Sequence, residues 1–204
     1  MYIAIEGIKG SGKSTIINEL VQDCIQSKLE YDIFPITAPM SENHPFEEKL
    51  RECPEIISSD DFVEKLFLHR AYWHQRKISW KSPIIIGDRS IATACVTRWN
   101  KWGDPNYTCN RVKRQYAGII KPKKIIWLDT DIDFAYKNIS KRSQKNTGVY
   151  DETFEKLYES KEAYSKLFFE QHYEKVFGNL KVISVKNNGN IEEVIYKIKQ
   201  VIYN

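Results

Sequence analysis

A glycine-rich segment near the start of the chain has the residue types and spacing needed to hold phosphate groups. Gly7-Ile-Lys-Gly-Ser-Gly-Lys-Ser14 matches the pattern G-x-x-x-x-G-K-[ST]. Its glycines permit backbone angles and a close approach that a Cβ atom would forbid, so successive N–H groups can turn onto an anion. Lys13 adds positive charge for the outer phosphates, and the Ser14 hydroxyl can ligate Mg²⁺. The segment therefore predicts binding of ATP with Mg²⁺.

The flanking sequence favours this interpretation over a chance match on a glycine-rich turn. The run Tyr2–Ile5 is apolar, as expected of a buried parallel strand. Residues 15–25 have the spacing of an amphipathic helix, whose N-terminal dipole would point at the same phosphates. A strand before the loop and a helix after it are the context that the motif requires. We expect the nucleotide to contact Gly7, Lys9, Gly10, Ser11, Gly12, Lys13, Ser14 and Thr15.

A charged pair, Asp88 and Arg89, follows another apolar run at residues 82–87. Arg89 could supply positive charge to a phosphate group in transfer, because that reaction depends on in-line positioning and charge stabilisation. Asp88 could orient Arg89, or bind Mg²⁺ directly or through water. The alternative is a structural ion pair at the end of a strand. The position of the pair at a strand end favours the functional interpretation.

Arg70 lies within a helical pattern over residues 62–75, beside His69, Tyr72 and Trp73. An arginine can grip a phosphate with two parallel hydrogen bonds while neighbouring aromatic rings sandwich a base. Periodicity alone favours the alternative, an exposed helix arginine beside a core aromatic stripe.

A series of basic residues leads up to and into a loop-like segment at residues 143–149. Its members are Lys137, Lys141, Arg142 and Lys145. A basic loop that closes over phosphates excludes water and completes the charge of the site. The alternative is a solvated charge run at the end of a helix, where cations also favour the dipole. We expect a short lid at about residues 142–151.

The rest of the chain alternates strand and helix patterns, which predicts an α/β fold with a five-stranded parallel sheet and helices on both faces. The predicted strands are residues 2–5, 31–37, 82–87, 123–128 and 180–185. The predicted helices are residues 15–25, 45–53, 62–75, 109–118, 132–142, 151–176 and 191–202. No repeat or linker interrupts the sequence, so we expect one domain over residues 1–204.

In such a sheet, ligands bind beyond the C-terminal ends of the strands. We therefore expect four segments from different strand ends to share one site: the glycine-rich loop, Thr37-Ala38-Pro39, Asp88-Arg89 and Asp129.

The composition fits a cytoplasmic, soluble protein that binds small anions. The 204 residues carry a formal net charge of +4, which is too small to indicate a nucleic acid polymer. The four cysteines show no metal-binding spacing and are expected to be reduced and mostly buried. The chain begins on a core strand without a signal peptide, and no apolar run approaches the length of about 20 residues that spans a bilayer.

Four motifs, in order and spacing, resemble the thymidylate kinase family over nearly the whole chain. The opening Ile3–Thr15 looks like I-x-x-E-G-x-[DE]-G-x-G-K-[ST]-T. The segment Leu66–Arg70 is similar to L-F-x-x-x-R, with one residue fewer between Phe67 and Arg70, and the arginine of that motif holds the acceptor phosphate in the family. The segment Asp88–Thr93 resembles D-R-[YH]-x-x-S, and residues 121–142 follow the P-D…L-D-x…A…R order that leads to the lid. The resemblance implies a P-loop kinase fold.

The resemblance also implies site residues and partners. The catalytic residues would be Lys13, Arg89 and Arg142, and Ser14 and Asp88 would bind the metal. The acceptor, dTMP or a related deoxynucleotide, would contact Pro39, Phe67, Arg70, Asp88, Arg89 and Thr93. ATP would donate the γ-phosphate, and a homodimer is possible because members of the family commonly form one.

Several residues depart from the family pattern. Lys9 replaces an acid, Ala38 replaces the acid of R-E-P, Ser90 replaces an aromatic residue or histidine, and Glu152 lacks the preceding arginine of D-R-x-E. These departures leave open a catalytically weak homologue that only binds nucleotides. A further alternative is a deoxynucleoside kinase, because Asp88-Arg-Ser90 also looks like the D/E-R-S motif of those enzymes.

The residue at position 38 distinguishes the two kinase alternatives. A deoxynucleoside kinase uses a glutamate at this place as a general base, and the chain has Ala38 there. A sugar hydroxyl benefits from such a base, whereas a nucleotide phosphate is already an anionic nucleophile. Ala38 therefore favours a nucleotide acceptor.

Overall fold

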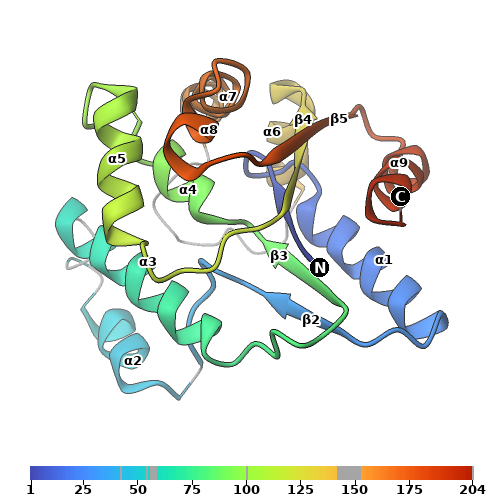
Figure 1. Ribbon diagram of the computed structural model, residues 1–204. Coiled ribbons are helices and arrows are strands. Elements are labelled where there is room, and N and C mark those ends of the chain that lie inside the picture. The colour runs from blue at the N-terminus through green and yellow to red at the C-terminus, as the bar shows by residue number, and fades with distance from the viewer. Residues whose placement is uncertain (42, 54, 56–58, 100, 142–152, 204) are drawn as a thin grey trace.

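Within the part of the chain that the computed structural model describes, five strands form one parallel sheet (Figure 1). The described residues are 1–41, 43–53, 55, 59–99, 101–141 and 153–203. The strand order is β2-β3-β1-β4-β5. The strands are β1 (Tyr2–Glu6), β2 (Tyr31–Phe34), β3 (Ile84–Asp88), β4 (Lys124–Thr130) and β5 (Lys181–Asn187). The predicted five-stranded parallel sheet is confirmed.

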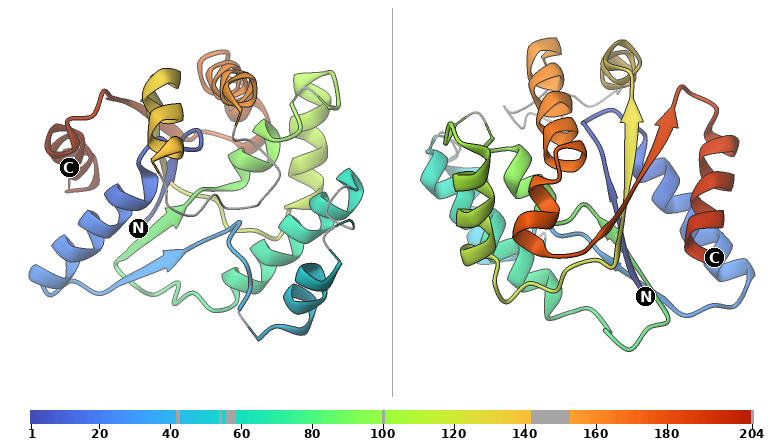
Figure 2. Two further views of the ribbon diagram at one scale, coloured as in Figure 1. Left: turned by 180° about the vertical axis from the view of Figure 1, so that it is seen from behind. Right: turned by 45° about the horizontal axis from the view of Figure 1, so that its top comes forward.

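Helices cover both faces of this sheet, also as predicted. The helices are α1 (Lys13–Gln26), α2 (Pro45–Glu52), α3 (Asp60–Gln75), α4 (Ile91–Val96), α5 (Pro105–Gln115), α6 (Ile132–Ser140), α7 (Phe154–Phe169), α8 (His172–Phe177) and α9 (Ile191–Tyr203). Figure 2 shows α1 and α9 on one face, and α3, α4, α5, α7 and α8 on the other.

The alternation of side chains along the strands creates the two core layers. In β1, Ile3 and Ile5 pack with α1 and α9, whereas Tyr2 and Ala4 pack with the helices of the opposite face. Each fully buried side chain of this size contributes roughly 1.5–3 kcal/mol of hydrophobic free energy. Because β1 is central and paired with both β3 and β4, burial on both faces fixes its register and hence the start of the loop that follows it.

Helix α4 was not predicted from the sequence. All six of its residues are buried, so the segment shows no amphipathic period. Its start is set by Ser90, whose side chain accepts a hydrogen bond from the Ala92 N–H. Helix α5 also begins earlier than predicted, because the Asp104 side chain caps it and Pro105 occupies its first turn.

The single helix predicted over residues 151–176 was wrong. The chain forms α7 and α8 instead, and Gln171 between them has a left-handed φ of 57°. This turn directs Tyr173 and Phe177 into the core, where their side chains are 1% and 8% exposed. Burial of these rings outweighs the local preference for a continuous helix.

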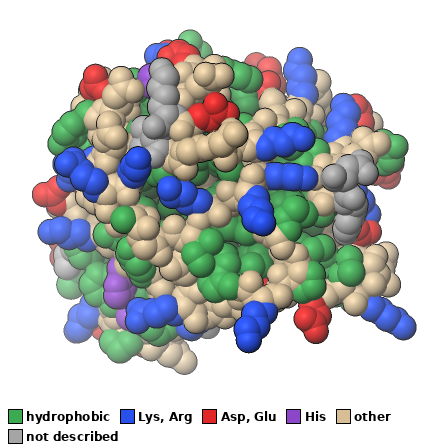
Figure 3. Space-filling view, viewed as in Figure 1, with side chains coloured by type: hydrophobic (Ala, Val, Ile, Leu, Met, Phe, Trp, Pro, Cys, Tyr) green, Lys and Arg blue, Asp and Glu red, His purple; other side chains and the backbone are tan. Residues whose placement is uncertain are grey.

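The surface carries dispersed charge. On the face shown in Figure 3, Lys and Arg side chains lie scattered among apolar and acidic ones. Among the residues that the structure describes, no helix is both long and apolar enough to cross a membrane. Of the four cysteines, Cys24, Cys95 and Cys109 are buried and Cys53 is partly exposed, and none of the four is in a disulfide.

Two glycines test how tightly the glycine-rich loop packs on α6. Gly10 and Gly103 both have positive φ, 81° and 73°, so an alanine at either position costs about 1–2 kcal/mol of backbone strain. A Cβ atom on Gly10 would lie 2.2 Å from the Ala135 carbonyl oxygen, whereas one on Gly103 would have no atom within 4 Å. We expect Gly10→Ala to lower the free energy of unfolding by about 2 kcal/mol more than Gly103→Ala. Denaturant unfolding measures both losses, and equal losses would contradict the packing described.

Candidate active site

The glycine-rich loop after β1 forms one wall of a cavity of about 230 Å³. Residues 9–15 line it together with Asp88 and Arg89 from the end of β3. Gly10 and Gly12 both adopt φ of 81°, a left-handed conformation that turns the loop around the cavity. Helix α1 begins at Lys13, so its N-terminus also faces this space. The loop and the Asp88–Arg89 pair, expected at one rim, do lie together.

Lys13 lies across its own loop. Its Nζ donates hydrogen bonds to the carbonyl oxygens of Gly7 (2.9 Å) and Ile8 (2.8 Å) and to the Ser11 hydroxyl (3.3 Å). The side chain is only 8% exposed, yet it lines the cavity. Its ammonium group is therefore held in place inside the loop, beside the cavity.

Two asparagine side chains hold the outer side of the loop. Asn138 of α6 donates to the Gly10 carbonyl at 3.0 Å, and Asn187 of β5 donates to the Ser11 carbonyl at 2.9 Å. With these carbonyls satisfied, the peptide groups are fixed in orientation around the cavity. Neither asparagine was predicted as a site residue. The signal in the sequence was the segment Asn187-Asn-Gly189, which directly follows the last predicted strand.

A buried carboxylate, Glu6, lies behind the cavity at the end of β1. It is 0% exposed and accepts four hydrogen bonds. Its Oε1 accepts from the Ser90 N–H and hydroxyl, both at 2.7 Å. Its Oε2 accepts from the Thr93 hydroxyl at 2.9 Å and the Tyr164 hydroxyl at 2.7 Å. Glu6 thereby joins β1, α4 and α7, and neither it nor Tyr164 was predicted as a site residue.

Arg89 is held by this network. Its φ of 71° is unusual for a residue other than glycine, and it aims the side chain back toward β1. Nη1 donates to the Gly7 carbonyl (3.4 Å), the Thr93 hydroxyl (3.3 Å) and the Tyr164 hydroxyl (3.2 Å). Arg89 also lines the cavity, so its charge borders the same space as the glycine-rich loop. Thr93 contacts Arg89 and Glu6 in this structure.

Arg70 has a partner that the sequence did not suggest. Its Nε and Nη2 donate to the two carboxylate oxygens of Glu47, each at 2.6 Å. Glu47 is 4% exposed and also accepts from the Met40 N–H at 3.1 Å. Burial acts to raise the pKa of Glu47, but hydrogen bonds and charge from Arg70 outweigh burial and leave the pKa below its usual value. The bidentate edge of Arg70, expected to face a phosphate, is thus bound to Glu47.

Helix α3 carries Arg70 and also contacts the loop after β2. His74 Nε2 lies 3.0 Å from the Ala38 carbonyl oxygen and 3.2 Å from that of Pro39. Phe67, one turn before Arg70, is partly exposed, and the Arg98 guanidinium lies 5.8 Å from its ring centre. The predicted acceptor residues Pro39, Phe67 and Arg70 therefore belong to one structural unit, apart from the cavity at the glycine-rich loop.

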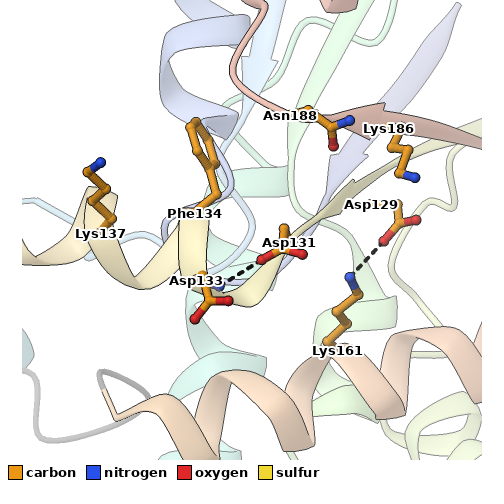
Figure 4. A pocket seen from close by; sticks show the side chains of 8 residues that line it. All are labelled: Asp129, Asp131, Asp133, Phe134, Lys137, Lys161, Lys186 and Asn188. Atoms are coloured by element: carbon orange, nitrogen blue, oxygen red, sulfur yellow. Dashed lines mark hydrogen bonds and ion pairs between the residues drawn. The ribbon is translucent and has the colours of Figure 1, made fainter.

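Asp129 lines a different cavity, of about 560 Å³ (Figure 4). Its carboxylate pairs with Lys161 of α7 at 3.1 Å. Lys137, one of the predicted lid cations, lines the same space. This separates Asp129 from the residues around the glycine-rich loop, contrary to the expectation of one shared site. Arg142 and the expected lid lie outside the described residues.

Replacing Glu47 by glutamine tests the ion pair with Arg70 through the pH dependence of stability. The folded-state pKa of Glu47 lies below its ordinary value of 4.5, so its stabilising contribution is present above that value and is lost as pH falls through the folded-state pKa. We expect Glu47→Gln to lower the free energy of unfolding by about 3 kcal/mol at pH 7, with a smaller difference at pH 3.

The matched control is Glu48→Gln, because Glu48 is exposed on the same helix. Its effect should stay below about 0.5 kcal/mol at both pH values. Urea unfolding at pH 7 and pH 3 measures the differences. A Glu47→Gln effect that is independent of pH would contradict the assigned ion pair.

Solved structures show the same fold. Deoxyadenosine kinase from M. mycoides, with dCMP and a flexible dCDP bound, has a TM-score of 0.68 and 21% sequence identity, covering 100% of this chain and 99% of that chain. The same enzyme with dATP bound gives a TM-score of 0.67 at 20% identity. The predicted P-loop kinase fold is confirmed.

Sequence comparison gives the family. The thymidylate kinase of Ureaplasma parvum serovar 3 is 23% identical over 213 residues, covering 98% of this chain and 88% of the relative. The probable thymidylate kinase of Picrophilus torridus is 27% identical, covering 94% and 89%. The family model for thymidylate kinase matches residues 5–198, from the end of β1 into α9, with the glycine-rich loop, Arg70 and Arg89 inside the match. The chain belongs to the thymidylate kinase family.

Proposed function

We propose that the protein is a magnesium-dependent nucleoside monophosphate kinase that transfers the γ-phosphate of ATP to dTMP or a related deoxynucleotide. The observation that carries this proposal is the cavity in which the glycine-rich loop, Lys13 and Arg89 meet. Phosphoryl transfer needs positive charge placed around the transferring group, and this cavity offers it from two strand ends. Membership of the family supports the same reaction.

The donor site follows from the loop. The peptide N–H groups of residues 10–14 and the N-terminus of α1 suit the phosphates of ATP. Ser14 and Asp88 line the same cavity with a hydroxyl and a carboxylate, the oxygen ligands that Mg²⁺ prefers. These two residues would hold the ion, which would neutralise phosphate charge. Lys13 and Arg89 would stabilise the transferring group, and Lys9 at the loop would add charge.

The acceptor site would lie along α3. Phe67 would stack on the base, and Arg70 would bind the acceptor. Because Glu47 occupies the Nε–Nη2 edge, Arg70 would reach the acceptor through its other terminal nitrogen, Nη1. Pro39, Asp88 and Thr93 would complete the acceptor site. Arg142 and a lid at about residues 142–151 would close over it, within one domain of residues 1–204.

A deoxynucleoside kinase is the second candidate, supported by Asp88-Arg-Ser90. The Ser90 hydroxyl and N–H both bind Glu6, so this serine has a defined structural place. A nucleoside hydroxyl would need a general base, however, and the side chain of Ala38 cannot supply one. A third candidate, a nucleotide-binding homologue with weak catalysis, has its support in Lys9, Ala38 and Glu152. We therefore favour a nucleotide acceptor, with a cytoplasmic location and a possible homodimer as further proposals.

The experiment that tests the proposal measures ADP formation with ATP, Mg²⁺ and a panel of acceptors. The panel contains the four deoxynucleosides and their 5′-monophosphates. We expect turnover with dTMP or another deoxynucleoside monophosphate and little with any nucleoside. Turnover confined to nucleosides would establish the second candidate, and binding of ATP without turnover on any acceptor would establish the third.

Arg70→Ala tests the acceptor site. We expect the loss of a charged hydrogen bond to lower kcat/KM for the nucleotide acceptor, mostly through a higher KM. The ratio of the two kcat/KM values should correspond to roughly 2–3 kcal/mol of binding free energy. The control is Arg111→Ala, because Arg111 makes a comparable two-nitrogen ion pair with Glu64 between α5 and α3. Steady-state kinetics of both variants measure the effect on acceptor binding, and thermal melts measure the effect on stability. Equal losses of kcat/KM in the two variants would remove Arg70 from the acceptor site.

A further inference from the structure

We propose that Tyr164 on α7 is a positioning residue, which fixes the guanidinium of Arg89 beside the phosphate cavity. The expected effect of Tyr164 on kcat rests on the proposed function. The contact by which Tyr164 holds Arg89 does not depend on that function. Neither the sequence pattern nor the family match assigns a role to Tyr164, which lies 75 residues from Arg89 in sequence.

The Tyr164 hydroxyl stands between a buried acid and the arginine. It donates to Glu6 Oε2 at 2.7 Å and accepts from Arg89 Nη1 at 3.2 Å. The directions are fixed by chemistry, because a guanidinium can only donate. Once the single hydroxyl proton is directed to Glu6, the oxygen lone pairs are left for Arg89. Tyr164 is 1% exposed, so water cannot readily take its place.

Among the described residues, three oxygen atoms accept hydrogen bonds from Nη1 of Arg89. The Tyr164 oxygen comes from a different part of the chain than the other two. The Gly7 carbonyl and the Thr93 hydroxyl belong to segments directly attached to β1 and β3. Tyr164 comes from α7, so it connects that helix to the arginine. The Thr93 hydroxyl oxygen also lies 3.2 Å from the Tyr164 hydroxyl oxygen, so the two hydroxyls that donate to Glu6 Oε2 lie next to each other.

The Tyr164 hydroxyl keeps its proton at neutral pH. Burial raises the pKa of Tyr164, and the charge of Glu6 raises it further, so the hydroxyl stays protonated at neutral pH. Arg89 lines the cavity, so a contact that anchors its Nη1 limits how far the guanidinium can shift beside that space. Preorganised charge is effective only in the right place, since a misplacement of about 1 Å can cost two orders of magnitude in rate.

Tyr164→Phe removes the anchoring oxygen and keeps the ring. We expect kcat for the nucleotide acceptor to fall about tenfold, with KM for ATP changed by less than about twofold. The control is Tyr2→Phe, because Tyr2 is 5% exposed and its hydroxyl has no hydrogen-bond partner among the described residues. It should keep the wild-type kcat. A wild-type kcat in Tyr164→Phe, or an equal loss in both variants, would overturn the proposal.

A double-mutant cycle shows whether Tyr164 acts through Arg89. In an Arg89→Ala background, Tyr164→Phe should cause no further loss of kcat, because the group it positions is gone. Losses that multiply would show that Tyr164 acts independently of Arg89 and would refute the positioning role.

Crystal structures of the wild type, Tyr164→Phe and Tyr2→Phe separate this inference from the proposed function. If the wild type phosphorylates no acceptor, the proposed function fails, and the position of Arg89 still decides the inference. We expect the Arg89 guanidinium to leave its place between Gly7 and Thr93 in Tyr164→Phe only. An unchanged guanidinium position in Tyr164→Phe would overturn the proposal.

Discussion

The arrangement of the site depends on one buried carboxylate. Burial of an unpaired charge would cost several kcal/mol, and the four hydrogen bonds to Glu6 offset that cost. Their donors come from the segment after β3 and from α7, so satisfying Glu6 requires these parts to meet behind the glycine-rich loop. The same donors, Thr93 and Tyr164, accept hydrogen bonds from Arg89. The desolvated acid thus determines where the arginine lies.

Topology brings the remaining groups to the same edge of the sheet. Strand β1 lies between β3 and β4, so the loop after β1 meets the end of β3 on one side and α6 on the other. Asn138 and Asn187 fix the loop carbonyls, and Lys13 spans the loop from inside. These contacts hold the loop, which we propose as the donor end of the site, in one arrangement. The proposed acceptor end depends on a separate ion pair, Arg70 with Glu47, between two helices.

Sequence reasoning succeeded where the signal is local. The glycine-rich loop, the five strands and the family follow from short motifs and apolar runs, and each is confirmed. It failed where contacts between distant segments determine the helix bounds or the partner of a side chain. Helix α4 has no polar face, and the break at Gln171 exists because Tyr173 and Phe177 pack in the core. Glu6, Glu47 and Tyr164 could not be recognised because their partners lie 23 to 158 residues away. The roles of the site residues stay predictions.

We propose that the cavity between the glycine-rich loop and Arg89 transfers phosphate to a nucleotide and not to a nucleoside, and a competition experiment distinguishes these two acceptors. The protein is given γ-labelled ATP, Mg²⁺ and equal concentrations of dTMP and thymidine, and the labelled products are separated. We expect label in dTDP and little in dTMP. Label that accumulates first in dTMP, formed from thymidine, would refute the assignment of a nucleotide acceptor.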